Sequence, residues 1–151
     1  MKEFEFFHGA VLVQLLDSST DGVKITRFNH SDNAAYVIDN KVGLYIKYST
    51  ARLSPWMFSF TKDHQLSFNK LTASYGKAFV ALICNEDGVA CLSESTLQSV
   101  LDDQFGDIEW IRVDRPAGGS YRVRGSDGSL EKKVPRSTFP RLILEALSSR
   151  G

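Results

Sequence analysis

The sequence predicts a single α/β (or α+β) domain of 151 residues, built around a mixed central sheet. Ala78–Ile83 is an unbroken apolar run, which is typical of a strand buried on both faces. The rings of Trp56, Phe58 and Phe60 are two residues apart, so they should share one face of another strand. Glu3–Leu16 has apolar residues at helical spacing and predicts an amphipathic helix.

The other elements are predicted from alternation, turn residues and helix caps. The expected strands are Val23–Phe28, Ala34–Ile38, Val42–Tyr48, Lys77–Cys84, Val89–Leu92, Ile108–Val113, Tyr121–Gly125 and Leu130–Val134, with tight turns at Asp39-Asn40-Lys41 and Ser126-Asp127-Gly128. The expected helices run from Thr61 or Asp63 to Ser74, from the capping pattern Ser95-x-x-Gln98, and over Pro140–Leu147. We expect one domain over residues 1–151, with a core at 3–113 and a basic hairpin and helix at 114–151.

The cysteines and histidines do not form a recognisable metal motif. Cys84 and Cys91 have neither zinc nor thioredoxin spacing, and a turn at Asp87-Gly88 would place them opposite each other as buried thiols. His8, His30 and His64 are scattered along the chain.

The net charge is zero and the isoelectric point is about 6.8, which is not that of a strongly basic nucleic-acid binder. Residues 1–109 carry 9 Lys and Arg against 14 Asp and Glu, a net charge of −5. Residues 110–151 carry 9 against 4, a net charge of +5. Either the basic part meets an anionic partner, or the two parts pair with each other.

No apolar stretch approaches the roughly 20 residues that cross a bilayer. Glu3 and Glu5 are unlike the positive start of a signal peptide, and Gln14 interrupts the apolar run that follows. We therefore expect a helix of the mature protein, no membrane partner and a cytoplasmic location.

The order of helix, three strands, helix and buried strand in the first half resembles the core of the PD-(D/E)xK, or restriction-endonuclease-like, superfamily. The segments Gly22–Phe28 and Leu44–Lys47 are similar to the corresponding region of its Holliday-junction-resolvase-type members. The resemblance implies an αβββαβ core, with Lys47 as the motif lysine and Glu5 as the carboxylate of the first helix. Asp32 or Asp39 would be the acid, and both are the implied metal ligands.

The motif departs from the superfamily at one position. Where (D/E)-x-K is expected the chain reads Tyr45-Ile46-Lys47, so the second carboxylate is absent. Mg²⁺, the cofactor that the resemblance implies, prefers carboxylate oxygens, and a tyrosine replaces them poorly. Either another carboxylate, from Asp39 or Glu5, takes this place, or the site is inactive.

Each of these residues also has a simpler interpretation. Lys47 could lie on the solvent face of a strand, Asp39 in a turn, Asp32 in a loop, and Glu5 in a solvated first helical turn.

Four basic residues are candidates for nucleic-acid contacts: Arg52, Arg122, Arg124 and Lys133. Arg122 and Arg124 alternate with apolar neighbours, so they should project from one face of a hairpin, where Lys133 could join them. The alternative is a solvated sheet edge whose charge discourages aggregation.

The sequence thus favours a nuclease-like domain that binds, and with an intact site cleaves, DNA or RNA by metal-assisted phosphodiester hydrolysis. The alternative is a non-catalytic protein-interaction module, homodimer or complex subunit of a bacterial defence or mobile-element system.

Overall fold

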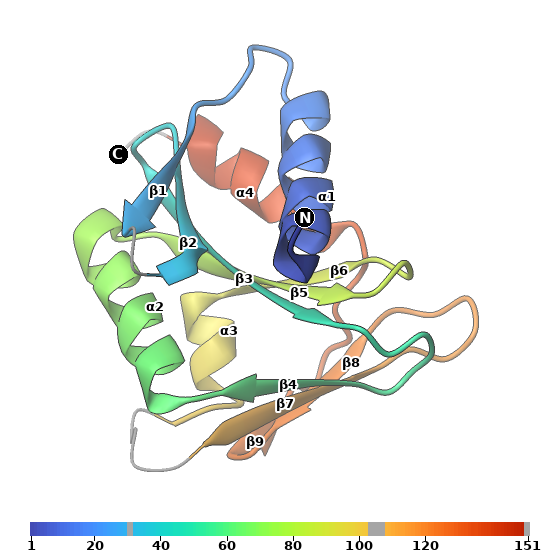
Figure 1. Ribbon diagram of the computed structural model, residues 1–151. Helices are drawn as coiled ribbons and strands as arrows, with labels where there is room; N and C mark the ends of the chain where they lie inside the picture. The colour runs from blue at the N-terminus through green and yellow to red at the C-terminus, as the bar shows by residue number, and fades with distance from the viewer. Residues whose placement is uncertain (30–31, 103–107, 150–151) are drawn as a thin grey trace.

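The structure is a computed structural model that describes residues 1–29, 32–102 and 108–149. Within these ranges the chain forms four helices and two sheets (Figure 1). The helices are α1 (Glu3–Ser18), α2 (Lys62–Tyr75), α3 (Glu94–Gln98) and α4 (Thr138–Ser148). The strands are β1 (Ile25–Asn29), β2 (Asp32–Ile38), β3 (Val42–Ser49), β4 (Trp56–Phe60), β5 (Ala78–Cys84), β6 (Val89–Ser93), β7 (Glu109–Asp114), β8 (Arg122–Gly125) and β9 (Gly128–Ser129).

The larger sheet is mixed and has the strand order β1-β2-β3-β5-β6. Its strands β3 and β5 are parallel, and the other neighbouring pairs are antiparallel. The predicted mixed α/β fold class is therefore confirmed. The elements α1, β1, β2, β3, α2 and β5 follow one another in the expected αβββαβ order, with β4 inserted before α2.

The strand β4 belongs to a second sheet, which is antiparallel and has the order β4-β7-β8-β9. The alternation patterns in the sequence did not predict this division into two sheets. Helices α1 and α4 cover one face of the larger sheet, and α2, α3 and the second sheet cover the other (Figure 1).

The strand β5 is buried along its whole length and lies between β3 and β6, as its apolar run predicted. Because side chains alternate along a strand, β5 contributes to two cores. Val80 and Leu82 face the second sheet, whereas Ala81 and Ile83 face α1 and α4.

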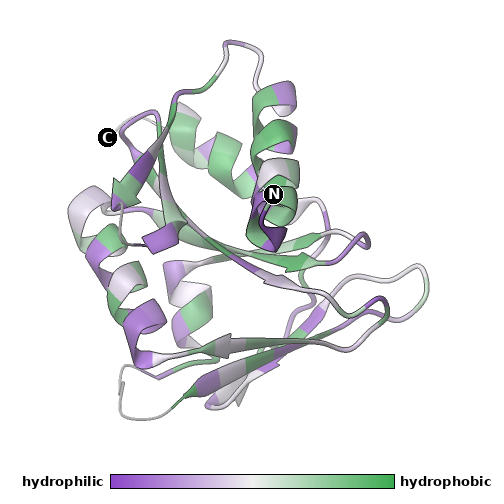
Figure 2. Ribbon diagram, in the orientation of Figure 1, coloured by the Kyte–Doolittle hydropathy of each residue, from purple (hydrophilic) through white to green (hydrophobic). Residues whose placement is uncertain are grey.

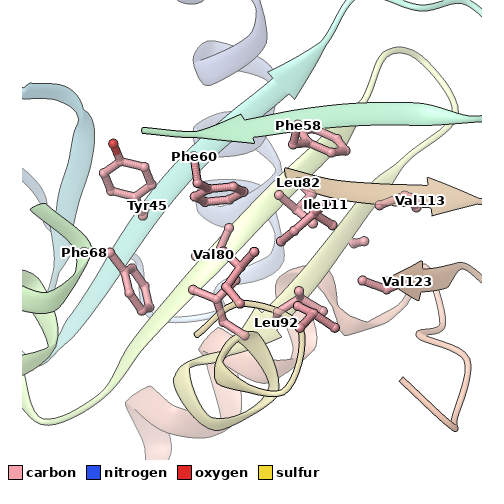
Figure 3. Close-up of a cluster of buried hydrophobic side chains, with 14 of the residues drawn as sticks. Tyr45, Phe58, Phe60, Phe68, Val80, Leu82, Leu92, Ile111, Val113 and Val123 are labelled. Atoms are coloured by element: carbon pink, nitrogen blue, oxygen red, sulfur yellow. The ribbon is translucent and has the colours of Figure 1, made fainter. Parts of the chain in front are cut away.

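The core between the sheets contains the three rings of β4, all of which are buried as expected. In Figure 3, Phe58 and Phe60 point from β4 toward Val80 and Leu82 of the larger sheet. The opposite core is closed by α4, which is largely hydrophobic in Figure 2. The strands that carry the candidate site are thus fixed by packing on both faces.

The turn between β2 and β3 has the predicted hairpin chemistry. Asp39 and Asn40 have φ angles of 53° and 56° and are the central residues of a turn that the Lys41 N–H closes by donating to the Ile38 carbonyl at 3.0 Å. The Asp39 carboxylate accepts a 2.7 Å hydrogen bond from the Lys24 backbone N–H and joins this turn to the start of the sheet.

Two local predictions are wrong in detail. Helix α3 is capped by Ser93, whose Oγ accepts from Thr96 N at 3.3 Å, and not by Ser95, because the helix begins at residue 94. The residues Leu130–Val134 do not form the expected strand. The partner of β8 is the two-residue strand β9 (Gly128–Ser129), and the chain then bends away before one isolated bridge joins Val134 to Tyr121.

The expected pairing of the two cysteines is also wrong, because Cys91 lies opposite Ala81 in the β5–β6 register. Cys84 faces the core between the sheets and Cys91 faces the other core. Both are buried free thiols, as predicted, and burial raises the pKa of each to about 12.

Among the described residues, an ion pair between Asp87 and Arg115 joins the acidic and basic parts of the chain. Arg115 donates to both carboxylate oxygens of Asp87, at 2.6 and 2.8 Å, and Tyr121 donates its hydroxyl to the same group at 2.8 Å. This contact supports the intramolecular interpretation of the charge asymmetry.

Among the described residues, no helix has the length and apolar character needed to cross a membrane.

Candidate functional site

A pocket of about 600 Å³ opens at the point where β2 separates from β3. The β2–β3 pairing runs from Ile38–Val42 to Ala35–Tyr45, whereas β3 continues to pair with β5 as far as Ser49. The edge of β3 beyond Tyr45 therefore forms one wall. The first turns of α1 and α2 reach the same pocket, so the positive ends of two helix dipoles lie beside it.

Lys47 is half-buried on β3, on the strand face that also carries Tyr45. Its Nζ lies 3.0 Å from His64 Nδ1 and 5.2 Å from the centre of the Phe60 ring. No described carboxylate lies within the 4.0 Å that defines a salt bridge to it. Burial lowers the pKa of Lys47 to about 8, although the charge of Asp32 opposes this effect.

His64 lies at the third position of α2 and closes the helix cap. Its backbone N–H donates to Thr61 Oγ1 at 3.2 Å, and the Thr61 backbone N–H donates to His64 Nδ1 at 3.2 Å. Because a backbone N–H can only donate, Nδ1 must be the acceptor and the neutral ring carries its proton on Nε2. Burial and the neighbouring Lys47 charge both lower the pKa of His64, which favours this neutral form.

Asp32 opens β2 and is held by neighbouring donors. Its Oδ1 accepts from Ala34 N at 2.9 Å, and its Oδ2 accepts a short hydrogen bond from Ser67 Oγ on α2. Burial raises the pKa of Tyr45, and the charge and hydrogen-bonding of Asp32 raise it further. Tyr45 therefore stays protonated, and the Asp32 carboxylate is held by Ala34 and Ser67.

The opposite wall comes from α1. His8 Nδ1 lies 2.9 Å from the Tyr36 hydroxyl, and burial lowers the pKa of His8 to about 4. Near the mouth, Tyr48 donates its hydroxyl to Glu3 at 3.1 Å. His8 is thus a neutral, buried residue that packs α1 against the sheet.

Of the four residues expected to form an active site, the structure brings two together. Asp32 and Lys47 both line the pocket. Asp39 follows the other end of β2, seven residues from Asp32, which corresponds to roughly 20 Å along a strand. Glu5 is exposed and accepts from the Lys2 backbone N–H at 2.8 Å, whereas the carboxylate of α1 that lines the pocket is Glu3.

The pocket does not fit the expected Mg²⁺ site. Asp32 and Asp39 are too far apart to share an ion, and Tyr45 occupies the position of the missing carboxylate. Among the described residues, the three-carboxylate group that could hold a metal lies elsewhere, at Asp102, Glu109 and Asp127. We therefore assign no metal-dependent step to the pocket.

The predicted basic contacts are exposed but do not line this pocket. Arg122 and Arg124 project from the outer face of β8, as expected. Arg52 lies in the loop between β3 and β4, and Lys133 lies beyond β9, outside the ladder that was expected to bring it beside the arginines.

Sequence reasoning missed the partners of Lys47 and Asp32 on α2. The only local signal was Thr61-x-x-His64, the spacing of a capping pair, which places His64 in the first turn of a helix. Nothing in the sequence relates Ser67 to Asp32, because their contact joins residues 35 positions apart.

No protein-family model matches the chain, and no curated protein or solved structure matches it either.

Proposed function

We propose that the protein is a nuclease-like domain that binds nucleic acid and receives a phosphate group in the Lys47 pocket. The observation that carries the proposal is the environment of the Lys47 ammonium. It is half-buried, its hydrogen-bond partner is a neutral ring, and no described carboxylate neutralises it by direct contact. Perturbed titratable groups in concave sites are typical of functional sites, and a phosphate would supply the missing negative charge.

The pocket offers donors for an anion. Lys47 provides ammonium N–H groups, and the helix starts add positive partial charge. Asp32 already accepts hydrogen bonds from Ser67 and the Ala34 backbone, so we assign it a positioning role. Phosphate binding is therefore the better supported part of the proposal, and cleavage is its extension.

The outer face of the second sheet offers a continuation for a polymer. Met57 lines the pocket and lies opposite Arg112 in the β4–β7 register, and Arg112 lies opposite Arg124 in the β7–β8 register. Arg122 projects from the same face of β8. Arg112 itself pairs with Asp114, so a nucleic-acid backbone that enters the pocket past Met57 would be followed across the sheet by Arg124 and Arg122.

Fluorescence anisotropy with labelled single-stranded DNA, duplex DNA and RNA at several salt concentrations tests the proposal. Lys47→Met should weaken binding and reduce the steepness of the log–log salt dependence by about 0.9 on duplex or 0.7 on a single strand. Lys41 is an exposed lysine just before the opposite end of β3, so Lys41→Met should leave both the affinity and its salt dependence unchanged. Replacing Arg122 and Arg124 by alanine should flatten the duplex dependence by up to about 2.

Cleavage is tested separately with and without Mg²⁺ or Mn²⁺. Because the residues of the pocket do not form a carboxylate cluster, we expect any cleavage to depend on Lys47 and to persist in a chelator. A protein that binds none of the three nucleic acids even at low salt would contradict the proposal.

The second candidate is a protein-interaction module. Met57 is 50% exposed and Trp110 is 38% exposed on neighbouring strands of the outer face, and such side chains are enriched in binding surfaces. Failure to bind nucleic acid, together with loss of partner capture or of homodimer formation on Trp110→Ser, would favour this alternative. In either case we place the protein in a cytoplasmic setting, where its two thiols would stay reduced.

A further inference from the structure

Three carboxylates converge at the end of the second sheet that lies beside α3. Asp102 follows α3, Glu109 opens β7, and Asp127 lies in the turn between β8 and β9. One oxygen of each lies within 4.8 Å of one oxygen of each of the others. The cluster is separate from the Lys47 pocket, and none of its members lines that pocket.

The backbone holds two of these residues together. The Asp102 N–H donates to Asp127 Oδ2 at 2.8 Å, and the Asp127 N–H donates to the Val100 carbonyl at 3.0 Å. The turn residue Gly128 lies so close that a Cβ there would be 2.3 Å from the Ser99 carbonyl oxygen. The end of α3 and the β8–β9 turn are therefore joined by contacts that also place two carboxylates side by side.

Glu109 supplies the observation that distinguishes this cluster from a group of surface acids. It lies on the inward face of β7, together with Ile111 and Val113, and only 6% of it is exposed. Its Oε2 is buried and has no hydrogen-bond partner among the described residues. A buried carboxylate oxygen without a partner is strongly unfavourable, so this position requires a neutralising group.

We propose that Asp102, Glu109 and Asp127 form a binding site for a divalent cation of the Ca²⁺ class. Oxygens within 4.8 Å of one another can all reach one ion at the 2.3–2.6 Å of Ca²⁺ coordination. Mg²⁺ requires shorter contacts and a near-ideal octahedron, and it gives up its bound waters reluctantly. The bound ion would connect the end of α3 to β7 and the β8–β9 turn.

A proton shared within the cluster is the competing way to neutralise it. Burial raises the pKa of Glu109 to about 7, and the nearby carboxylates add to this effect. The two explanations differ in what stabilises the folded protein. If a cation binds, adding it raises the stability at constant pH. If a proton is shared, only a lower pH raises the stability.

The test uses the full chain, freed of metal with a chelator, at pH 7.5. Ca²⁺ titrated into the wild type should raise the melting temperature in a concentration-dependent way, and isothermal calorimetry should show about one site. Glu109→Gln, which keeps the shape and removes the charge, should weaken Ca²⁺ binding at least tenfold. Glu131→Gln, at an exposed position, should bind as the wild type does.

Asp127→Asn provides a second variant if Glu109→Gln does not fold, and it should weaken binding similarly. Lys47→Met should bind Ca²⁺ normally, which separates this proposal from the proposed function. Two outcomes overturn the cation site: a wild type whose melting temperature and heat signal do not respond to Ca²⁺, and Ca²⁺ binding that survives in both carboxylate variants.

Discussion

Replacing Lys47 by methionine should stabilise the protein while it removes the proposed phosphate ligand. Methionine keeps most of the aliphatic stem and deletes the ammonium. Burial lowers the pKa of Lys47 from 10.5 to about 8. Since one pKa unit corresponds to about 1.4 kcal/mol, the charged form costs at most about 3 kcal/mol in the folded state.

Two corrections reduce this figure. Water still reaches the half-buried amine, which brings the cost to about 2 kcal/mol. The lost hydrogen bond to His64 returns roughly 1 kcal/mol or less, because His64 Nδ1 keeps the bond from Thr61 N. We expect Lys47→Met to be more stable than the wild type by about 1–2 kcal/mol at pH 7, or about 2–8 °C in melting temperature.

The pH dependence has a defined sign. Below pH 8 the lysine is charged in both the folded and unfolded states, and the full cost is present. Between pH 8 and 10.5 the unfolded chain holds this proton and the folded protein does not, so the stability of the wild type rises relative to the variant. The advantage of Lys47→Met should therefore disappear by about pH 10.5.

Urea unfolding of the wild type, Lys47→Met and Lys41→Met at pH 7, 8, 9 and 10.5 measures this difference. The exposed Lys41 should show neither the gain nor its loss with pH. A Lys47→Met variant that is no more stable than the wild type at pH 7, with a difference that stays constant to pH 10.5, would refute the desolvated ammonium and with it the basis of the proposed function.

Two further predictions concern the framework around the sites. Gly43→Ala should destabilise the protein by about 1–3 kcal/mol in chemical denaturation, because the added Cβ would lie 2.4 Å from Leu71 Cγ in a fully buried contact; an unchanged midpoint would mean that the helix moves aside freely. Asp87→Asn should remove part of the acid sensitivity of the fold, because the hydrogen bonds from Arg115 hold the pKa of Asp87 below its usual 3.8. The stability that this lowered pKa supplies is present above pH 4 and is lost as the pH falls through the pKa of Asp87 in the folded protein. Identical acid-unfolding profiles for the variant and the wild type would contradict this role.

The secondary structure could be predicted largely because its signals are local. The apolar run of β5, the alternating rings of β4 and the helical spacing of α1 each depend on neighbours within a few residues. The second sheet could not be predicted, because strands of both sheets show the same alternation and the pairing of β4 with β7 joins residues about 50 positions apart. The β8–β9 hairpin was predicted too long, since Tyr121 and Val134 satisfy the pattern but are joined by a single bridge.

The candidate site shows the same limit more sharply. Lys47 and Asp32 could be proposed from the sequence because a resemblance placed them in order along the chain. That order gave no information on distance, so Asp39 was an equal candidate although it lies beyond the other end of β2. His64 reaches Lys47 only because α2 crosses back over the sheet, and no pattern around residue 64 indicates that crossing.

Lys47 and Glu109 share a physical feature that no resemblance reveals. Each is a charged strand residue two positions from a residue, Tyr45 or Ile111, that faces the core between the sheets. An apolar residue of similar size would be more stable at either position without a ligand, since a desolvated charge without an opposite partner is unfavourable. Opposite ligands should therefore offset the two costs: a phosphate at the ammonium and a cation at the carboxylate. Without ligand, Lys47→Met and Glu109→Gln should then each be more stable than the wild type. Phosphate should no longer stabilise Lys47→Met, which should still respond to Ca²⁺. Ca²⁺ should no longer stabilise Glu109→Gln, which should still respond to phosphate.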